Sequence, residues 1–566
     1  MSLTALSIIV ILILVLGYTL YGRLIAKQFT LDDKATTPAV KINDGVDFVP
    51  TKRFFLLGQH FSAIAAAGPI AGPIIACQLF GWGPSILWIA LGVVFIGAVH
   101  DMSALIASVR HRARSVAEIM KEHVGRRAWL AMLAFIWLAL VYLIIAFADI
   151  TAATFFGKTK ELQGSFPFNP GGAVAAASTI YLLLAIVMGL VKRVFKAPLW
   201  LMTLIFVPAT LAAVWLGTQV STLLVFSQTS WAVTILVYCF IASLLPVWLL
   251  LQPRGYLGGF VLYLVLAIGV IGIFFGGFDV KQPVITTAPV LGLSGSIIPF
   301  LFVTIACGAV SGFHGLVSSG TTAKQLEKES DARVVGYGGM LLEAFVALIA
   351  LATIMIVAPE VSKGVAPGRV YGDGIARFLT VVVGEQAFLF AATFGAMAFS
   401  TFVFDTLDVA TRLGRYILQE LTNTHTRTAA AIATAITAGV PALVLVITGP
   451  GGYQMFWTLF GTSNQLLAAL TLLGITVWLY LTGKRYWFTL APMIFLMTMT
   501  LWSLVGQTLR FTRGALASQT PAAAIPQVAN ASVAVLLFAL TVFLVIEAIR
   551  AVLRPRPTQP LTGMPA

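Results

Sequence analysis

Two apolar stretches of this chain carry prolines where an unbroken membrane helix would be expected. The sharper one is GQHFSAIAAAGPIAGPIIACQ, in which Pro69 and Pro73 each follow a glycine. The other is LLPVWLLLQPRGYLGG, with Pro246 and Pro253. Each unpaired backbone group is costly in a bilayer, so a broken helix persists only around a buried or water-filled site. Paired interruptions in the two halves of a chain are typical of the binding site of a secondary transporter.

The composition supports a membrane protein. Of the 566 residues, 59% are hydrophobic and only 10% are charged. The net charge of +14 does not indicate nucleic-acid binding, because the basic residues lie in short loops between apolar runs rather than in one patch. The three cysteines all lie in apolar stretches, which argues against a disulfide framework and against a zinc site.

The hydropathy pattern predicts an all-α polytopic membrane protein with about 15 transmembrane helices. Most of the predicted segments approach the roughly 20 residues that a helix needs to cross the hydrocarbon core. Placing the N-terminus outside and the C-terminus in the cytoplasm puts most of the 35 Lys and Arg residues on the inner side, as the positive-inside rule requires. The predicted spans are 4–20, 54–79, 84–109, 128–154, 173–191, 198–216, 231–251, 256–276, 296–320, 336–357, 386–404, 429–446, 456–482, 487–505 and 531–549.

The two interrupted spans are the second and the seventh in this series. Because their starts are five spans apart, an odd number, they would cross the membrane in opposite directions, as in an inverted five-helix repeat. We therefore expect four parts in the chain. These are an extra N-terminal helix and loop (1–53), a first repeat (54–217), a second repeat (230–420) and four additional C-terminal helices (421–566).

The first break has the chemistry of an anion site. Its prolines remove amide donors, and its glycines let backbone approach a ligand closely. The free amides that begin the second half-helix suit a carboxylate. We expect the substrate to contact this segment, with Gln59, His60 or His314 contributing polar contacts and Arg254 acting as a gate or retention charge. A simple proline kink is the alternative. The predicted substrate-binding residues are Gln59, His60, Gly68, Pro69, Gly72, Pro73, Arg254 and His314.

Ionisable residues within the predicted spans are candidates for proton coupling, because an acid in the middle of a membrane helix costs about 2.5–3.5 kcal/mol. The candidates are Asp101, His60, His314, Glu343 and Asp149. Asp149 has the alternative of reaching the outer interface. Asp405 and Asp408 are expected to form a weak surface ion-pair cluster with Arg412 and Arg415.

Hydroxyl side chains in the stretch TIACGAVSGFHGLVSSGTTAKQL suggest a cation site, which keeps sodium coupling open. The residues are Ser311, Ser318, Ser319 and Thr321. Close helix packing by small residues is the alternative for most of them. The sequence contains no phosphate-binding loop, no nucleophile-elbow motif and no Cys/His spacing typical of a metal site. We therefore expect neither an enzyme nor a cofactor nor a bound metal.

The chain resembles the carbon starvation protein A family. The matching stretches include the first broken segment, GAVHDMSALIASVRHRARSVAEI, LLPVWLLLQPRGYL, TIACGAVSGFHGLVSSGTTAKQL, VVGYGGMLLEAFVAL, DTLDVATRLGRYILQEL and LFGTSNQLLAALTLLG. The resemblance implies a LeuT-type fold, a 5+5 inverted-repeat core, in an inner-membrane carrier of small carboxylates, pyruvate above all, driven by proton symport. Peptide uptake, also attributed to the family, is the alternative substrate class. Gly255 departs from the acid that often follows the Pro-Arg pair in the family.

Residues carried over by the family motifs are Gln59, His60, Gly68, Pro69, Gly72, Pro73, Asp101, Arg254, His314, Glu343 and Asp408. Together with the predicted repeat, they lead to the hypothesis of alternating access with a small carboxylate or peptide and a co-transported proton, or sodium, as partners. The lipid bilayer is the only other expected partner. Nucleic acid is not expected, and the sequence leaves homo-oligomers and a small accessory membrane protein open.

Overall fold

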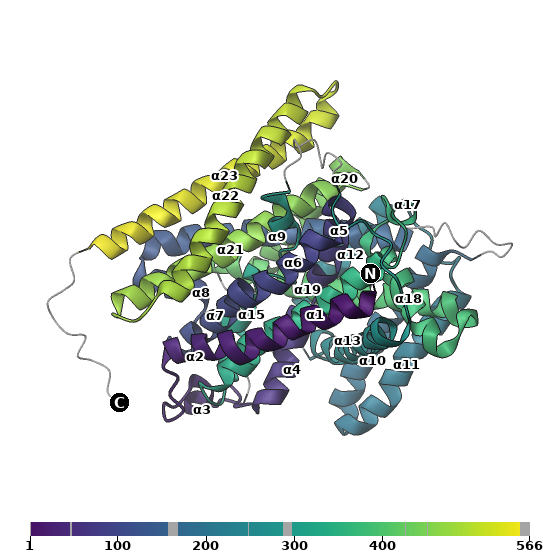
Figure 1. Ribbon diagram of the computed structural model, residues 1–566, viewed down its shortest axis with the longest axis horizontal. Coiled ribbons are helices and arrows are strands. Elements are labelled where there is room, and N and C mark those ends of the chain that lie inside the picture. The colour runs from purple at the N-terminus through teal and green to yellow at the C-terminus, as the bar shows by residue number, and fades with distance from the viewer. Residues whose placement is uncertain are drawn as a thin grey trace.

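The structure is a computed structural model that describes residues 2–45, 48–156, 168–246, 248–286, 297–424, 426–449 and 451–554. Within these residues the regular elements are helices, apart from two isolated bridges, Ser2–Asp279 and Thr51–Leu326. The helices form one bundle, from which α22 (Trp487–Leu516) and α23 (Pro521–Leu553) extend side by side (Figure 1). The all-α class is therefore confirmed.

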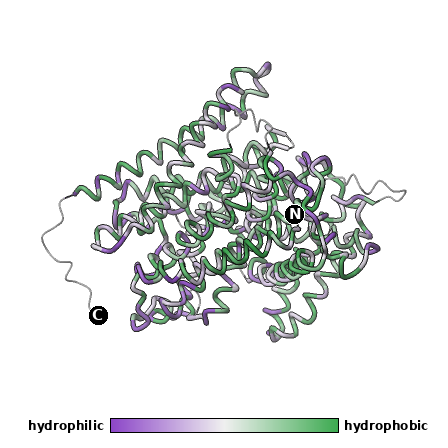
Figure 2. The backbone as a smooth tube through the Cα atoms, viewed as in Figure 1, coloured by the Kyte–Doolittle hydropathy of each residue, from purple (hydrophilic) through white to green (hydrophobic). Residues whose placement is uncertain are grey.

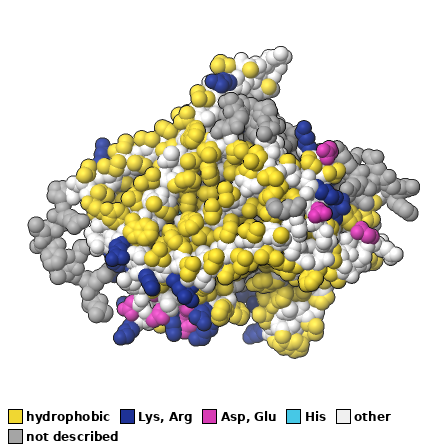
Figure 3. All heavy atoms as spheres, viewed as in Figure 1, with side chains coloured by type: hydrophobic (Ala, Val, Ile, Leu, Met, Phe, Trp, Pro, Cys, Tyr) yellow, Lys and Arg dark blue, Asp and Glu magenta, His cyan; other side chains and the backbone are white. Residues whose placement is uncertain are grey.

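The described residues contain 12 helices that are long and apolar enough to cross a membrane, or up to 13 when one bent pair counts as a span. The helices therefore support a multi-pass membrane protein. By length and composition, the described residues contain fewer spans than the expected fifteen. The expected spans 231–251 and 296–320 do not qualify. The first corresponds to α12 (Gln228–Leu244), which has only 17 residues, and the second is broken. Apolar residues dominate the helices (Figure 2), and on the face in Figure 3 charged side chains gather mainly at the edges of a broad hydrophobic area.

The break at Pro69 is confirmed. Helix α4 (Arg53–Ile64) and helix α5 (Gly68–Phe80) are bent by 48° relative to each other. Pro69 occupies the first turn of α5, where the amide that proline lacks would have no intrahelical partner. Pro73 lies inside α5. The sequence signal and the local structure therefore agree in this half of the chain.

The second break lies elsewhere than predicted. Helix α12 ends at Leu244, Pro246 lies in the connection to α13 (Leu251–Phe275), and Pro253 occupies the first turn of α13. These prolines therefore mark an ordinary helix end and helix start. The second broken element is instead α14 (Phe300–Thr304) followed by α15 (Gly312–Gly320), within the expected span 296–320. Its first expected residue, Ser296, lies outside the described residues.

The remaining helices surround the two broken ones. Helix α5 packs on α16, α7 on α15, α9 on both α19 and α21, and α12 on α20. In the most apolar 18-residue stretch of Met455–Leu481, 89% of the residues are buried, compared with 28% in that of Leu199–Gln219. The former span therefore lies in the centre of the bundle and the latter at its periphery. The other elements are α1 (Leu3–Leu16), η1 (Gly17–Tyr21), α2 (Gly22–Phe29), α3 (Pro38–Ile42), α6 (Trp82–Gly92), η2 (Val93–Gly97), α7 (Ala98–Arg110), α8 (Val116–His123), α9 (Arg126–Phe156), α10 (Pro170–Phe195), α11 (Leu199–Gln219), η4 (Thr322–Lys324), η5 (Arg333–Tyr337), α16 (Gly338–Met355), α17 (Pro359–Ser362), α18 (Pro367–Val383), η6 (Glu385–Ala387), α19 (Phe388–Thr422), α20 (Arg427–Thr448) and α21 (Tyr453–Leu481).

Candidate functional site

The two broken helices cross at their breaks. A Cβ atom added to Gly68 would lie 2.4 Å from Cys307 Cβ, and one added to Gly72 would lie 3.0 Å from the carbonyl oxygen of Thr304. From the other side, a Cβ on Gly308 would lie 3.2 Å from Pro69 Cα. Gly308 has φ +85°, a backbone conformation that side chains disfavour. The glycines therefore permit direct backbone contact between α5 and the segment that joins α14 to α15.

Side chains satisfy the backbone groups that the second break releases. The indole nitrogens of Trp457 and Trp88 donate to the carbonyls of Thr304 (3.0 Å) and Ile305 (3.1 Å). The carboxylate of Glu343 accepts from the amide of Gly308 at 3.1 Å. These partners meet the requirement that polar backbone within a membrane protein be paired. In the same region, the side chain of Asn464 on α21 accepts from the amide of Phe313 at 3.0 Å and donates to Ser311 and Cys307.

A cluster of four ionisable side chains lies against this break. The His314 ring on α15 bridges two carboxylates. Its Nδ1 lies 2.9 Å from Asp101 Oδ2 on α7, and its Nε2 lies 3.1 Å from Glu343 Oε2 on α16. The other oxygen of Asp101 lies 2.7 Å from Nδ1 of His100. All four side chains are at most 1% exposed. The cluster therefore joins three helices through groups that can gain or lose a proton.

The charge balance of this cluster is unusual for a buried site. With both carboxylates ionised and His314 protonated, the group would carry one negative charge, and one further proton would neutralise it. Uncompensated buried charge is expensive, so a change in proton occupancy would alter the relative stability of helix arrangements that bury or expose the cluster. The expected proton-coupling residues Asp101, His314 and Glu343 are thus brought together by the structure.

The other predicted residues are not all at this centre. His60 is buried on α4, where its Nδ1 lies 3.0 Å from the hydroxyl of Thr322, and its Nε2 has no hydrogen-bond partner among the described residues. Gln59 on the same helix is exposed. Asp149 on α9 is buried, and it accepts a hydrogen bond of 2.8 Å from Gln228, the first residue of α12.

The expected cation site of four hydroxyls is not assembled. Ser311 precedes the first residue of α15 and Thr321 follows its last, so the nine-residue helix separates them by about 14 Å at 1.5 Å per residue. The Ser319 and Thr321 hydroxyls donate to carbonyls of their own helix, at 2.7 and 3.0 Å. Ser318 is buried without a hydrogen-bond partner among the described residues. One cation therefore cannot contact all four residues.

Arg254 is the largest fully buried side chain among the described residues, and it pairs with acids of α19. Its Nε donates to Asp405 Oδ1 at 2.9 Å, and its Nη1 pairs with Asp408 Oδ2. The Tyr238 hydroxyl also donates to Asp408, at 2.8 Å. The expectation that these two acids form a weak surface cluster was wrong. The order of charges along α19 does not reveal that Arg254, on α13, packs against them.

Arg412 and Arg415, the expected partners of those acids, have a different role. Arg412 Nη2 donates to the carbonyls of Ala242 and Leu245, and Arg415 Nη1 donates to that of Ser243. These carbonyls belong to the C-terminal end of α12, which has no further helical turn to satisfy them. The two arginines therefore cap α12 from α19.

Sequence reasoning missed Asn464, Trp88 and Trp457 as partners of the broken backbone. Asn464 lies within LFGTSNQLLAALTLLG, and an amide side chain in so apolar a stretch was the available signal. The tryptophans carried no comparable signal, since these residues are common throughout membrane helices. Only the fold shows which carbonyls they reach.

The close crossing of the two breaks gives a first prediction. Replacing Gly68 with alanine should destabilise the protein by about 1–3 kcal/mol, because the new methyl group would overlap the Cys307 side chain. The double variant Gly68→Ala/Cys307→Gly should recover much of that loss, because it removes the overlapping atoms. Thermal unfolding of the detergent-purified protein measures both effects. Equal unfolding temperatures for the wild type and Gly68→Ala would show that the breaks do not pack as described.

The sequence comparisons with a family model and with known relatives indicate a transporter. Residues 2–373 and 363–503 match the family described as carbon starvation protein CstA. The chain is 34% identical to "Peptide transporter CstA" of Helicobacter pylori strain ATCC 700392 / 26695, over 86% of this chain and 79% of that one. It is 32% identical to "Pyruvate/proton symporter BtsT" of Escherichia coli K12, with the same two coverages. Among solved structures, a manganese transporter variant of Eremococcus coleocola is similar with a TM-score of 0.44 and 16% identity, covering 90% of this chain and 99% of that one.

Proposed function

Because the chain belongs to the carbon starvation protein CstA family, whose members are transporters and not enzymes, we propose that it takes up pyruvate or a related small monocarboxylate together with a proton. The protein would lie in the cytoplasmic membrane, with its N-terminus outside the cell and its C-terminus in the cytoplasm. The similar Escherichia coli protein is named a pyruvate/proton symporter, which favours this substrate and this coupling ion.

The Asp101–His314–Glu343 cluster is the observation that carries the proposal. A symporter needs a group whose proton occupancy differs between its two states, because a ligand shifts an equilibrium only through differential affinity. The cluster joins α7, α15 and α16, so movement of α15 against the other two would separate His314 from its carboxylates. Sodium coupling has less support, because the candidate hydroxyls do not converge.

Alternating access is the proposed mechanism, since the crossing point of the two breaks is buried and a substrate could reach it only when helices move. The expected LeuT-type inverted repeat stays part of the proposal, with one change. The positions of the two breaks favour pairing α4/α5 with α14/α15, rather than with α12. Two π-helical segments are consistent with this pairing. Segment η2 lies in the helix that follows α4/α5, and η5 begins the helix that follows α14/α15. The expected bounds 54–217 of the first repeat stay a prediction. The expected start of the second repeat at residue 230 belongs to the pairing with α12, because α14 begins only at Phe300.

The substrate carboxylate is proposed to bind at the start of α5. The first helical acceptor there is the carbonyl of Ala67, which receives the amides of Ile70 and Ala71. Ala67 and Gly68 therefore have the amides that lead the helix, at the positive end of its dipole. Arg254 is proposed to hold a closed state through Asp405 and Asp408 rather than to bind substrate.

A peptide is the second candidate substrate, because the similar Helicobacter pylori protein is named a peptide transporter. Proteoliposomes of the purified protein distinguish the two substrates. Uptake of a labelled dipeptide that added pyruvate does not reduce would favour a peptide over the carboxylate. Competition by pyruvate and other short-chain monocarboxylates, with no dipeptide uptake, would favour the first proposal.

Electrical measurements test the coupling. One proton moving with one monocarboxylate anion carries no net charge, so a membrane potential, which is worth about 2.3 kcal/mol per charge per 100 mV, should not drive uptake. We expect labelled pyruvate to accumulate in proteoliposomes with an inward proton gradient, and an imposed potassium diffusion potential to leave that accumulation unchanged. A strong dependence on the potential would rule out this stoichiometry.

A further inference from the structure

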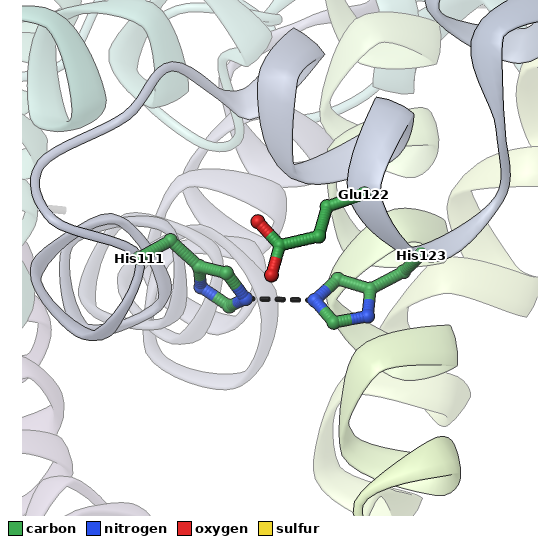
Figure 4. Close-up of side chains that lie close together, drawn as sticks. All are labelled: His111, Glu122 and His123. Carbon is green, nitrogen blue, oxygen red and sulfur yellow. Dashed lines mark hydrogen bonds between the residues drawn. The ribbon is translucent and has the colours of Figure 1, made fainter. Parts of the chain in front are cut away.

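A second cluster of ionisable groups lies beyond the end of α7, outside the membrane-spanning segments and apart from the transport proposal. His111 follows the last residue of α7, and Glu122 and His123 are the last two residues of α8. One possible ligand atom from each residue lies within 4.8 Å of those of the other two. Figure 4 shows the two imidazole rings facing each other with the Glu122 carboxylate beside the gap between them.

Hydrogen bonding orients the two rings for a shared ligand. His111 Nδ1 lies 2.6 Å from the carbonyl oxygen of Ala107, which can only accept, so Nδ1 carries the proton and Nε2 offers a lone pair. That lone pair faces His123 Nε2 at 2.7 Å, so without metal His123 Nε2 donates its hydrogen to it. Metal binding would replace this hydrogen bond, with His123 carrying its proton on Nδ1 instead. A backbone carbonyl that fixes the tautomer of a histidine is the usual outer support of a metal ligand. The Trp478 ring lies against His111, with centroids 5.0 Å apart, and restrains it further.

The three groups form a His₂Glu set, which matches the donors of three-ligand zinc sites. Two Zn–N bonds of about 2.0–2.1 Å at a tetrahedral angle put the nitrogens about 3.3 Å apart. The rings would therefore separate by a few tenths of an ångström on binding, which the half-buried His123 allows. Glu122 is 45% exposed and pairs with Arg114 at 3.1 Å, so its carboxylate is reachable and has a competing partner.

We propose that His111, Glu122 and His123 bind one Zn²⁺ ion or a similar late transition-metal ion. The ion would connect the end of α7 to α8. Because α8 packs on α9 and α21, the ion would stabilise the position of α7 relative to these helices. The sequence prediction of no metal site rested on spacing within motifs. The eleven residues that separate the two histidines match none of those spacings, and the turn between α7 and α8 closes the distance.

Metal titration of the purified full-length protein tests the proposal. The protein is purified in detergent without a polyhistidine tag, and bound metal is removed with a chelator. Its affinity for Zn²⁺ is then measured by competition with a chromogenic chelator. We expect one Zn²⁺ per chain, loss of this site in His123→Ala, and a weakening of about tenfold or more in Glu122→Gln. The matched control Arg114→Ala removes the partner that competes for Glu122, so it should bind Zn²⁺ as tightly as the wild type or more tightly.

Folding is checked separately by gel filtration and by the unfolding temperature without metal. Zn²⁺ should raise the unfolding temperature of the wild type and of Arg114→Ala, but not that of His123→Ala. If His123→Ala does not fold, Glu122→Gln decides, because its side chain is exposed and keeps its shape. The proposal is overturned by the absence of stoichiometric Zn²⁺ binding, or by binding that neither His123→Ala nor Glu122→Gln weakens.

Discussion

Asp101→Asn should abolish proton-driven accumulation of substrate while leaving substrate exchange across the membrane. The asparagine keeps the size of the side chain but removes one of the two carboxylates that hold His314. The cluster would then be neutral with His314 protonated, so it would no longer need a second proton in the closed arrangement. We expect accumulation driven by a pH gradient in proteoliposomes to fall by about 100-fold or more, which corresponds to about 2.7 kcal/mol of lost coupling.

Counterflow of labelled against unlabelled substrate separates coupling from binding, because exchange needs no net proton movement. Asp149→Asn is the matched control. Asp149 is also a buried acid in a membrane helix, but it lies on α9 and accepts from Gln228. It should keep proton-driven uptake. Normal accumulation by Asp101→Asn would remove Asp101 from the coupling mechanism, and a defect confined to Asp149→Asn would move the proton site to α9.

Arg254→Leu should destabilise the protein strongly, by about 3–5 kcal/mol, because it leaves Asp405 and Asp408 facing each other without their cation. Replacing all three charges, as in Arg254→Leu/Asp405→Asn/Asp408→Asn, should recover most of that stability, since a buried ion cluster replaced as a whole is often neutral in energy. The unfolding temperature in detergent measures both effects.

Arg412→Leu is the control for the loss of an arginine from the same region. Its guanidinium donates to two backbone carbonyls, so its loss should cost less than that of Arg254. The experiment also separates two roles of Arg254. An Arg254→Leu protein as stable as the wild type, with weaker substrate binding, would show that Arg254 is a substrate ligand and not a structural cation.

Much of the site could be predicted from the sequence where a local rule applied. The Gly-Pro pairs predicted the break between α4 and α5, because proline removes an amide donor wherever it occurs. Asp101, His314 and Glu343 stood out because acids and histidines are rare in apolar spans. The same proline rule misplaced the second break. Pro246 and Pro253 are compatible with a helix end and a helix start, and sequence alone does not separate that case from a break inside a span.

By itself, the sequence determined the all-helical membrane class, the first broken helix and the membership of the family, because each depends on residue type or on similarity along the chain. The tertiary structure decided which groups meet. It joined His314 to two carboxylates from other helices, paired Arg254 with Asp405 and Asp408, and opened the second helix at Gly308 without a proline. These contacts join residues far apart in the chain. Their geometry depends on how whole helices pack, and no local pattern of residues encodes that packing.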